Sequence, residues 1–177
     1  MEHLIHGVRD AIRKECWYPA LAQALAIPDT CGAIDLPGRG KSRKRYTAWF
    51  DKYIAQDFRS SVPHSQQFFT ADDMYLLRCA YLHEGDMDFD EPGAPKFNGG
   101  VVEGATLFLE DRGSIVPSLG GTGSMQYMFG LEDLCELICR GAEAWLVDTR
   151  KDPRKVDALS KLKRIIRFTE SFEWKPV

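Results

Sequence analysis

Apolar residues recur every three or four positions over most of this chain, which is the period of an amphipathic helix. Proline and glycine mark where such helices begin, break and end. Pro28 predicts a kink or a restart within the second helix, because proline lacks the amide proton that a helix interior needs. The predicted helices cover residues 4–16, 20–36 with the break at Pro28, 46–58, 70–84, 131–146 and 153–167.

The apolar period changes to two from Val101 onward, which indicates strands. Residues 101–110 form the first predicted strand, and residues 111–113 form a turn. Residues 114–119 are expected to return antiparallel to the first strand, as in a β-hairpin. Residues 124–129 are a candidate third strand.

These elements predict a single domain over residues 1–177. We expect a mainly helical bundle of five or six helices, with a small antiparallel β-hairpin or three-stranded sheet inserted at about 99–129. The apolar stripes of the helices also predict its core. The residues expected there are Leu4, Trp49, Phe50, Tyr53, Leu77, Tyr81, Leu134, Ile138, Trp145 and Leu159.

Length and composition fit this single domain and limit its partners. A chain of 177 residues with 44% hydrophobic content can bury a core, and a net charge of −3 excludes a uniformly basic nucleic-acid binder. The five cysteines include no Cys-x-x-Cys pair, which is typical of a reducing compartment, so we expect a cytoplasmic protein. No secretory signal and no run of about eighteen apolar residues is present, so we expect no membrane insertion.

The helix predicted at 70–84 contains the strongest candidate chemistry. Thr70 and Asp73 have the spacing of a capping box at its start, and Gly85 is a natural C-terminal stop. Apolar residues surround almost the whole helix, yet Arg78 lies among them. An arginine in such surroundings must be paired or directed at a ligand, because an unpaired buried charge costs several kcal/mol.

The stretch LLRCAYLHEG, with Arg78-x4-His83, resembles the Arg-x(4 to 6)-His motif of the HEPN superfamily. The resemblance implies an HEPN-like helical bundle of a kind that often dimerises and cleaves RNA without a metal. It therefore implies a metal-independent endoribonuclease, acting as a homodimer in defence or toxin-type growth control. Arg78 and His83 would be the catalytic residues: His83 would move a proton, and Arg78 would stabilise charge on the phosphate.

Cys79 keeps an alternative function open. The family usually has a polar residue directly after the arginine, and this chain has Cys79 there. A catalytically silent HEPN-like module that serves as an RNA- or protein-binding scaffold would fit that difference. Arg78 would then pair with an acid elsewhere, and His83 would only favour the negative end of the helix dipole. A helical domain unrelated to the family is the third possibility.

The spacing of the pair also predicts a dimer. Residues five apart on an α-helix diverge by about 140°, so Arg78 and His83 of one copy are not expected to meet. Two copies facing each other across an axis could bring them together. The apolar character of the helix all round favours the same arrangement.

Residues 37–45 are predicted to form a basic loop. This loop is a candidate contact for RNA phosphates, although a merely solvated loop is an equal alternative. Its cations are Arg39, Lys41, Arg43, Lys44 and Arg45.

No metal and no nucleotide cofactor is predicted for this chain. Gly40-Lys41-Ser42 imitates the end of a phosphate-binding loop, but Asp35 occupies the place of the required first glycine. Asp86 opens an imitation of a calcium loop, in which Glu91 stands where glycine is needed.

Overall fold

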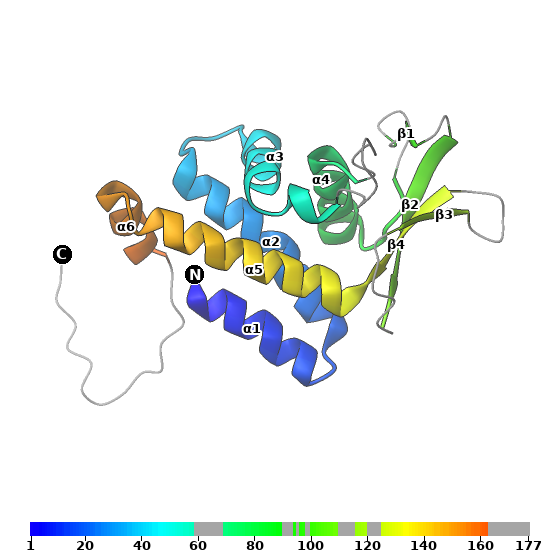
Figure 1. The fold of residues 1–177 in the computed structure, drawn as a ribbon, viewed down its shortest axis with the longest axis horizontal. Helices are drawn as coiled ribbons and strands as arrows, with labels where there is room; N and C mark the ends of the chain where they lie inside the picture. The colour runs from blue at the N-terminus through cyan, green and yellow to red at the C-terminus, as the bar shows by residue number, and fades with distance from the viewer. Residues whose placement is uncertain are drawn as a thin grey trace.

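The computed structural model describes residues 1–58, 69–89, 94, 96–97, 100–109, 116–119 and 125–162 (Figure 1). The predicted turn at 111–113 and the part of the last predicted helix after residue 162 lie outside these ranges.

The described part is mainly helical, as predicted, with a small sheet at one end of the helices (Figure 1). Helix α2 is central and packs against α1, α3 and α5. Two short turns follow α3 and α4: the 3-10 turn η1 and the π turn η2. The helical elements are α1 Glu2–Arg13, α2 Trp17–Asp35, α3 Ser42–Tyr53, η1 Ala55–Phe58, α4 Ala71–Cys79, η2 Ala80–Glu84, α5 Leu131–Thr149 and α6 Pro153–Ser160.

Two helix boundaries differ from the prediction. Helix α2 continues through Pro28 without restarting, because it is enclosed by three other helices and Pro28 is buried within that packing. Helix α3 begins at Ser42, so Arg43, Lys44 and Arg45 belong to a helix and not to a loop. The predicted restart at Pro28 is therefore wrong, and so is the assignment of residues 42–45 to the basic loop.

The sheet differs more from the prediction. Its four strands lie in the order β1-β2-β4-β3, and the central pair, β2 and β4, is parallel. The predicted hairpin is wrong: β3 pairs antiparallel with β4, which separates β3 from β2. Tyr127 and Phe129 of β4 are buried, and a strand this apolar is more stable in the centre of a sheet than at its edge. The strands are β1 Lys96–Phe97, β2 Gly100–Phe108, β3 Val116–Leu119 and β4 Met125–Gly130.

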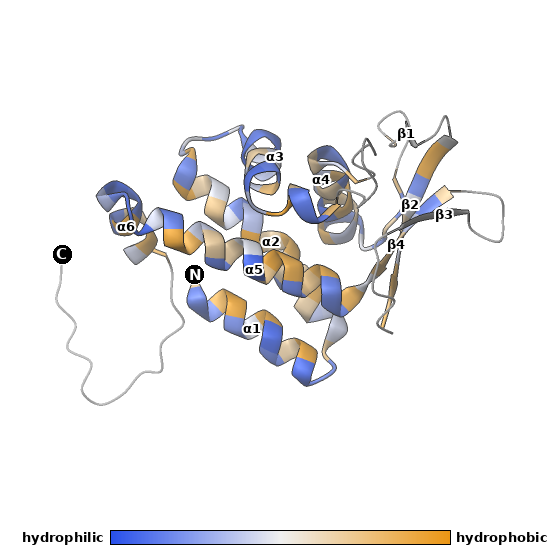
Figure 2. Cartoon of the chain, in the orientation of Figure 1, coloured by the Kyte–Doolittle hydropathy of each residue, from blue (hydrophilic) through white to orange (hydrophobic). Residues whose placement is uncertain are grey.

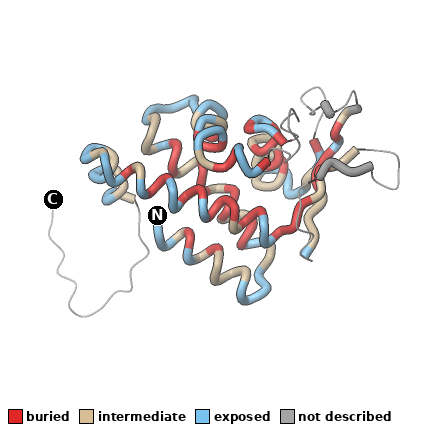
Figure 3. Tube along the Cα trace, in the orientation of Figure 1, coloured by how far each residue is buried: buried red, intermediate tan, exposed pale blue. Residues whose placement is uncertain are grey.

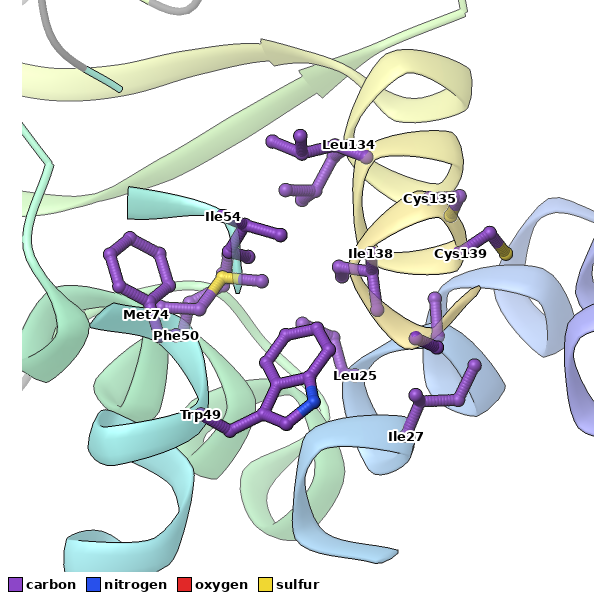
Figure 4. Packing of buried hydrophobic residues seen from close by; sticks show 14 of the residues in the cluster. Leu25, Ile27, Trp49, Phe50, Ile54, Met74, Leu134, Cys135, Ile138 and Cys139 are labelled. Carbon is purple, nitrogen blue, oxygen red and sulfur yellow. The ribbon is translucent and has the colours of Figure 1, made fainter. Parts of the chain in front are cut away.

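The core runs between the helices and continues to the sheet. Hydrophobic and hydrophilic positions alternate along the helices in Figure 2, and buried positions follow α5 and the segment that leads into it in Figure 3. In Figure 4, Ile138 of α5 and Ile54 lie close to the ring of Trp49. Six of the ten predicted core residues are buried, and the other four are partly buried and packed against the cluster. The partly buried ones are Leu4, Tyr53, Tyr81 and Leu159.

Cys135 and Cys139 of α5 are part of this core (Figure 4). Burial raises the pKa of each thiol to about 12. They contribute to packing, as their positions in the helix predicted. Across the ranges that the structure describes, no helix is both long and apolar enough to cross a bilayer.

Candidate functional site

The start of α4 is fixed by a capping box and by the sheet. The Thr70 amide donates to Asp73 Oδ2 at 2.8 Å, and the Asp73 amide donates to Thr70 Oγ1 at 3.3 Å. The Tyr127 hydroxyl of β4 also donates to Asp73 Oδ2, at 3.1 Å. The predicted capping box is confirmed, and α4 is held in position against β4.

The end of α4 widens into the π turn η2. The Gly85 amide donates to the carbonyl of Ala80, five residues earlier, at 3.0 Å, and Gly85 has a left-handed φ of 78°. A π turn contains one residue more than the corresponding α turn, so residues five apart in sequence lie on the same side of the helix, one turn apart. Such single turns are rare and frequently occur at functional sites.

The π turn brings Arg78 and His83 together within one chain. Arg78 Nη1 lies 2.8 Å from His83 Nε2. The expectation that the two side chains diverge is therefore wrong, because it assumed α-helical geometry up to Gly85. A guanidinium can only donate, so Nε2 accepts and the ring proton of a neutral His83 is on Nδ1. His83 is exposed to solvent.

Asp29 of α2 is the third member of this site, and the sequence analysis did not identify it. Arg78 Nε donates to Asp29 Oδ2 at 2.8 Å, and Ser42 Oγ donates to Asp29 Oδ1 at 2.9 Å. Burial by itself would lower the pKa of Arg78, but the charge of Asp29 and hydrogen bonds to Cys79 and Asp29 raise it above its ordinary value. Asp29 lies 49 residues before Arg78, so only the need for an acidic partner could have suggested it.

The ion pair is only partly enclosed. The side chain of Arg78 is 16% exposed and that of Asp29 is 24% exposed. In the described part of the chain, Arg78 Nη2 has no hydrogen-bond partner. The guanidinium thus bridges a carboxylate and an imidazole and keeps one nitrogen available.

The basic candidates separate into distinct groups. Arg43 lies nearest α4: its Nε donates to Asp72 Oδ1 at 2.8 Å, and its guanidinium carbon lies 5.9 Å from the centroid of the Tyr75 ring. Arg45 instead binds the carbonyls of Leu36 and Gly38 and closes the loop before α3.

The other three cations are all exposed. Lys41 donates to the carbonyl of Pro37 at 3.3 Å, whereas the side chains of Arg39 and Lys44 have no hydrogen-bond or ion-pair partner among the described residues. Only Arg43 is therefore joined to the helix that carries Arg78.

The arrangement combines a neutral imidazole, able to take a proton, with a guanidinium, able to bind an anion. This combination suits proton transfer beside a phosphate or carboxylate.

No family model, curated protein or solved structure matches this chain.

Proposed function

We propose that the protein is a metal-independent endoribonuclease in which Arg78 and His83 act on the scissile phosphodiester. The observation that carries the proposal is the 2.8 Å contact between Arg78 Nη1 of α4 and Nε2 of the exposed His83 on the π turn η2. The resemblance to the HEPN motif supports the same function and suggests a role in defence or toxin-type growth control. Five free cysteines favour a reducing, cytoplasmic setting.

The chemistry follows from the protonation state of the pair. RNA supplies its own nucleophile, the 2′-hydroxyl, so the reaction requires no activated serine or metal-bound water. Neutral His83 accepts the 2′-hydroxyl proton as the 2′ oxygen bonds to phosphorus, and Arg78 stabilises the charge that develops on the phosphorus oxygens. The bond from phosphorus to the 5′ oxygen then breaks, and the leaving 5′ oxygen takes a proton from water, which leaves a 2′,3′-cyclic phosphate. The phosphate would replace His83 as the partner of Arg78 Nη1, and this exchange frees Nε2 to take the proton.

Homodimerisation stays a prediction, but the geometry of the Arg78–His83 pair no longer argues for it. One chain already brings the catalytic pair together, so a dimer is not needed to assemble it. Light scattering would distinguish a monomer of 20.1 kDa from a dimer of twice that mass. The ribonuclease proposal is compatible with both results.

The first prediction is that Arg78→Ala and His83→Ala each lower RNA cleavage about a hundredfold or more, because each removes a group that acts in the transition state. Cleavage of a single-stranded RNA would be followed in the presence of a metal chelator. His6→Ala and Arg150→Ala are matched controls, since both residues are exposed; His6 lies on α1 and Arg150 directly follows α5. They should leave the rate unchanged.

A rate that is independent of His83 between about pH 5 and pH 9 would remove it as the acid or base. Activity that disappears with the chelator would contradict the metal-independent chemistry.

The catalytically silent module remains the second candidate, and the Arg78–Asp29 ion pair favours it. In that case Arg78 joins α4 to α2 and has no substrate. Wild-type protein would then bind RNA or a protein partner without cleaving RNA, and Arg78→Ala would lower stability without changing any rate.

A further inference from the structure

Asp29 also forms part of the wall of a pocket. This pocket of about 680 Å³ opens between the C-terminal half of α2 and helix α6. Figure 1 shows α6 beside the end of α2 from which this wall is built. Asp29 also holds Arg78, so this one residue connects the pocket wall with the candidate catalytic pair.

We propose that this pocket is a subsite for one nucleotide of the RNA strand, next to the scissile phosphate. The inference rests on the proposed ribonuclease function and names the part of the substrate that the site would hold. The volume exceeds that of one nucleobase and leaves room for its ribose. An unpaired nucleotide suits such a pocket, since single-stranded RNA is recognised through bases that leave the stack.

The pocket walls match the two faces of a base. Ala33, Ile34, Pro37 and Ala158 provide apolar surface for the flat faces of the ring. Thr30 and Asp152 provide oxygen atoms that can contact its edge.

Asp152 would read the base. Its Oδ1 accepts from the Arg154 amide at 3.0 Å as the N-cap of α6, whereas Oδ2 has no hydrogen-bond partner among the described residues. The Arg154 amide lowers the pKa of Asp152, so the side chain is a carboxylate at neutral pH. A carboxylate accepts hydrogen bonds and cannot donate them. Uracil offers it only the N3–H, which lies between two carbonyl oxygens that repel a carboxylate, so Asp152 favours bases with an exocyclic amino group.

Charge in the pocket also suits a nucleotide. Asp35 is neutralised by Lys155 at 2.6 Å and accepts a hydrogen bond from the indole of Trp145, and Asp29 is neutralised by Arg78. Arg154 lies at the rim with its side chain 92% exposed and reaches Asp152 only at 3.5 Å. It is therefore available for a phosphate oxygen.

The test measures binding of AMP, CMP, GMP and UMP by titration calorimetry. We expect the three amino-bearing nucleotides to bind about tenfold more tightly than UMP, because a hydrogen bond to a charged acceptor has about that effect. Asp152→Asn should reduce this preference and keep the fold, since asparagine is an equally good N-cap. Equal binding of all four nucleotides to the wild type, or displacement of each by inorganic phosphate alone, would overturn the proposal.

A pair of matched variants locates the site. Ala33→Phe fills the pocket from an exposed helical position, and Ala144→Phe makes the same change at an exposed position of α5 outside it. Only Ala33→Phe should weaken nucleotide binding and raise the KM for RNA, each by about tenfold, because the phenyl ring occupies the space that the base would fill. Equal losses in both variants would place the nucleotide elsewhere.

The two proposals fail separately. Nucleotide binding in the pocket without RNA cleavage would reject the ribonuclease and keep the subsite. Cleavage that Ala33→Phe leaves unchanged would reject the subsite and keep the ribonuclease.

Discussion

At Arg78 a single guanidinium is shared between a carboxylate and an imidazole. Asp29 accepts a hydrogen bond from Nε, and His83 accepts one from Nη1. An arginine held only by His83 would move freely, because His83 is exposed. Asp29, itself fixed by Ser42, is what gives Arg78 a defined position.

We therefore predict that Asp29→Asn lowers the free energy of unfolding by about 1–3 kcal/mol, because the partly buried guanidinium loses its charged partner. Urea unfolding monitored by circular dichroism would measure the change. Asp10→Asn is the control, since Asp10 pairs with Arg13 on the exposed surface of α1, where such pairs contribute about 0–1 kcal/mol. Equal effects of the two substitutions would mean that the Asp29–Arg78 pair contributes no more than a surface pair.

Asp73 makes stability depend on pH. Burial raises its pKa above the usual range, although hydrogen bonds from Thr70 and Tyr127 oppose the shift. The folded state therefore binds this proton more tightly than the unfolded state, so the contribution of Asp73 to stability is complete below about pH 4 and falls as pH rises through the raised pKa. Asp73→Asn should have a flatter Tm profile than wild type above about pH 4, as pH rises through the raised pKa of Asp73. Parallel profiles would contradict this assignment.

At the scale of the element, η2 decides whether the candidate site exists. The sequence predicted where this helix begins and ends, from Thr70, Asp73 and Gly85, and both ends are confirmed. It did not predict the π turn, because one extra residue within one turn leaves almost no trace in an apolar pattern that covers the whole helix. The predicted divergence of the Arg78 and His83 side chains was wrong for that reason alone.

The role of the π turn can be tested by changing its length. Deleting Leu82 would leave four residues of spacing between Arg78 and the histidine, which an ordinary α turn places on one face. We expect the deletion variant to retain RNA cleavage within about tenfold, and a variant with one alanine inserted after Leu82 to lose about a hundredfold. Cleavage that is insensitive to both changes would show that the contact has no part in catalysis.

The sheet was less predictable than the helices. The alternation after Val101 correctly indicated a strand, but pairing partners are not encoded locally. β2 pairs with β4 across a connection that contains β3, and that choice depends on the burial of Tyr127 and Phe129 against the helices. Asp29 was missed for the same physical reason, since its role arises only when α2, α3 and α4 are packed together.

At the scale of the whole molecule, helices α5 and α3 approach each other closely at one glycine. Gly141 of α5 faces α3 and the residue that follows it: a Cβ there would lie 2.5 Å from Ile54 Cγ2 and 2.8 Å from Trp49 Cη2. Both neighbours are almost completely buried, so neither has space to move. The absence of a side chain at Gly141 thus sets the spacing between α5 and α3.

The last prediction is that Gly141→Ala destabilises the protein although alanine favours helices. Overpacking costs about 1–3 kcal/mol and helix propensity returns up to about 1 kcal/mol, so a net loss of about 1–2 kcal/mol and a Tm lower by about 2–8 °C are expected.

Gly7→Ala in α1 is the matched control, because its new Cβ would meet only the amide end of Gln23, 2.6 Å away, which can rotate. That variant should stay within about 1 kcal/mol of wild type, since the gain in propensity offsets the hydrogen bond from Gln23 to Leu4. Scanning calorimetry of both variants decides the matter: a Tm for Gly141→Ala equal to or above that of Gly7→Ala would mean that Trp49 and Ile54 can yield and that α3 and α5 are not in such close contact.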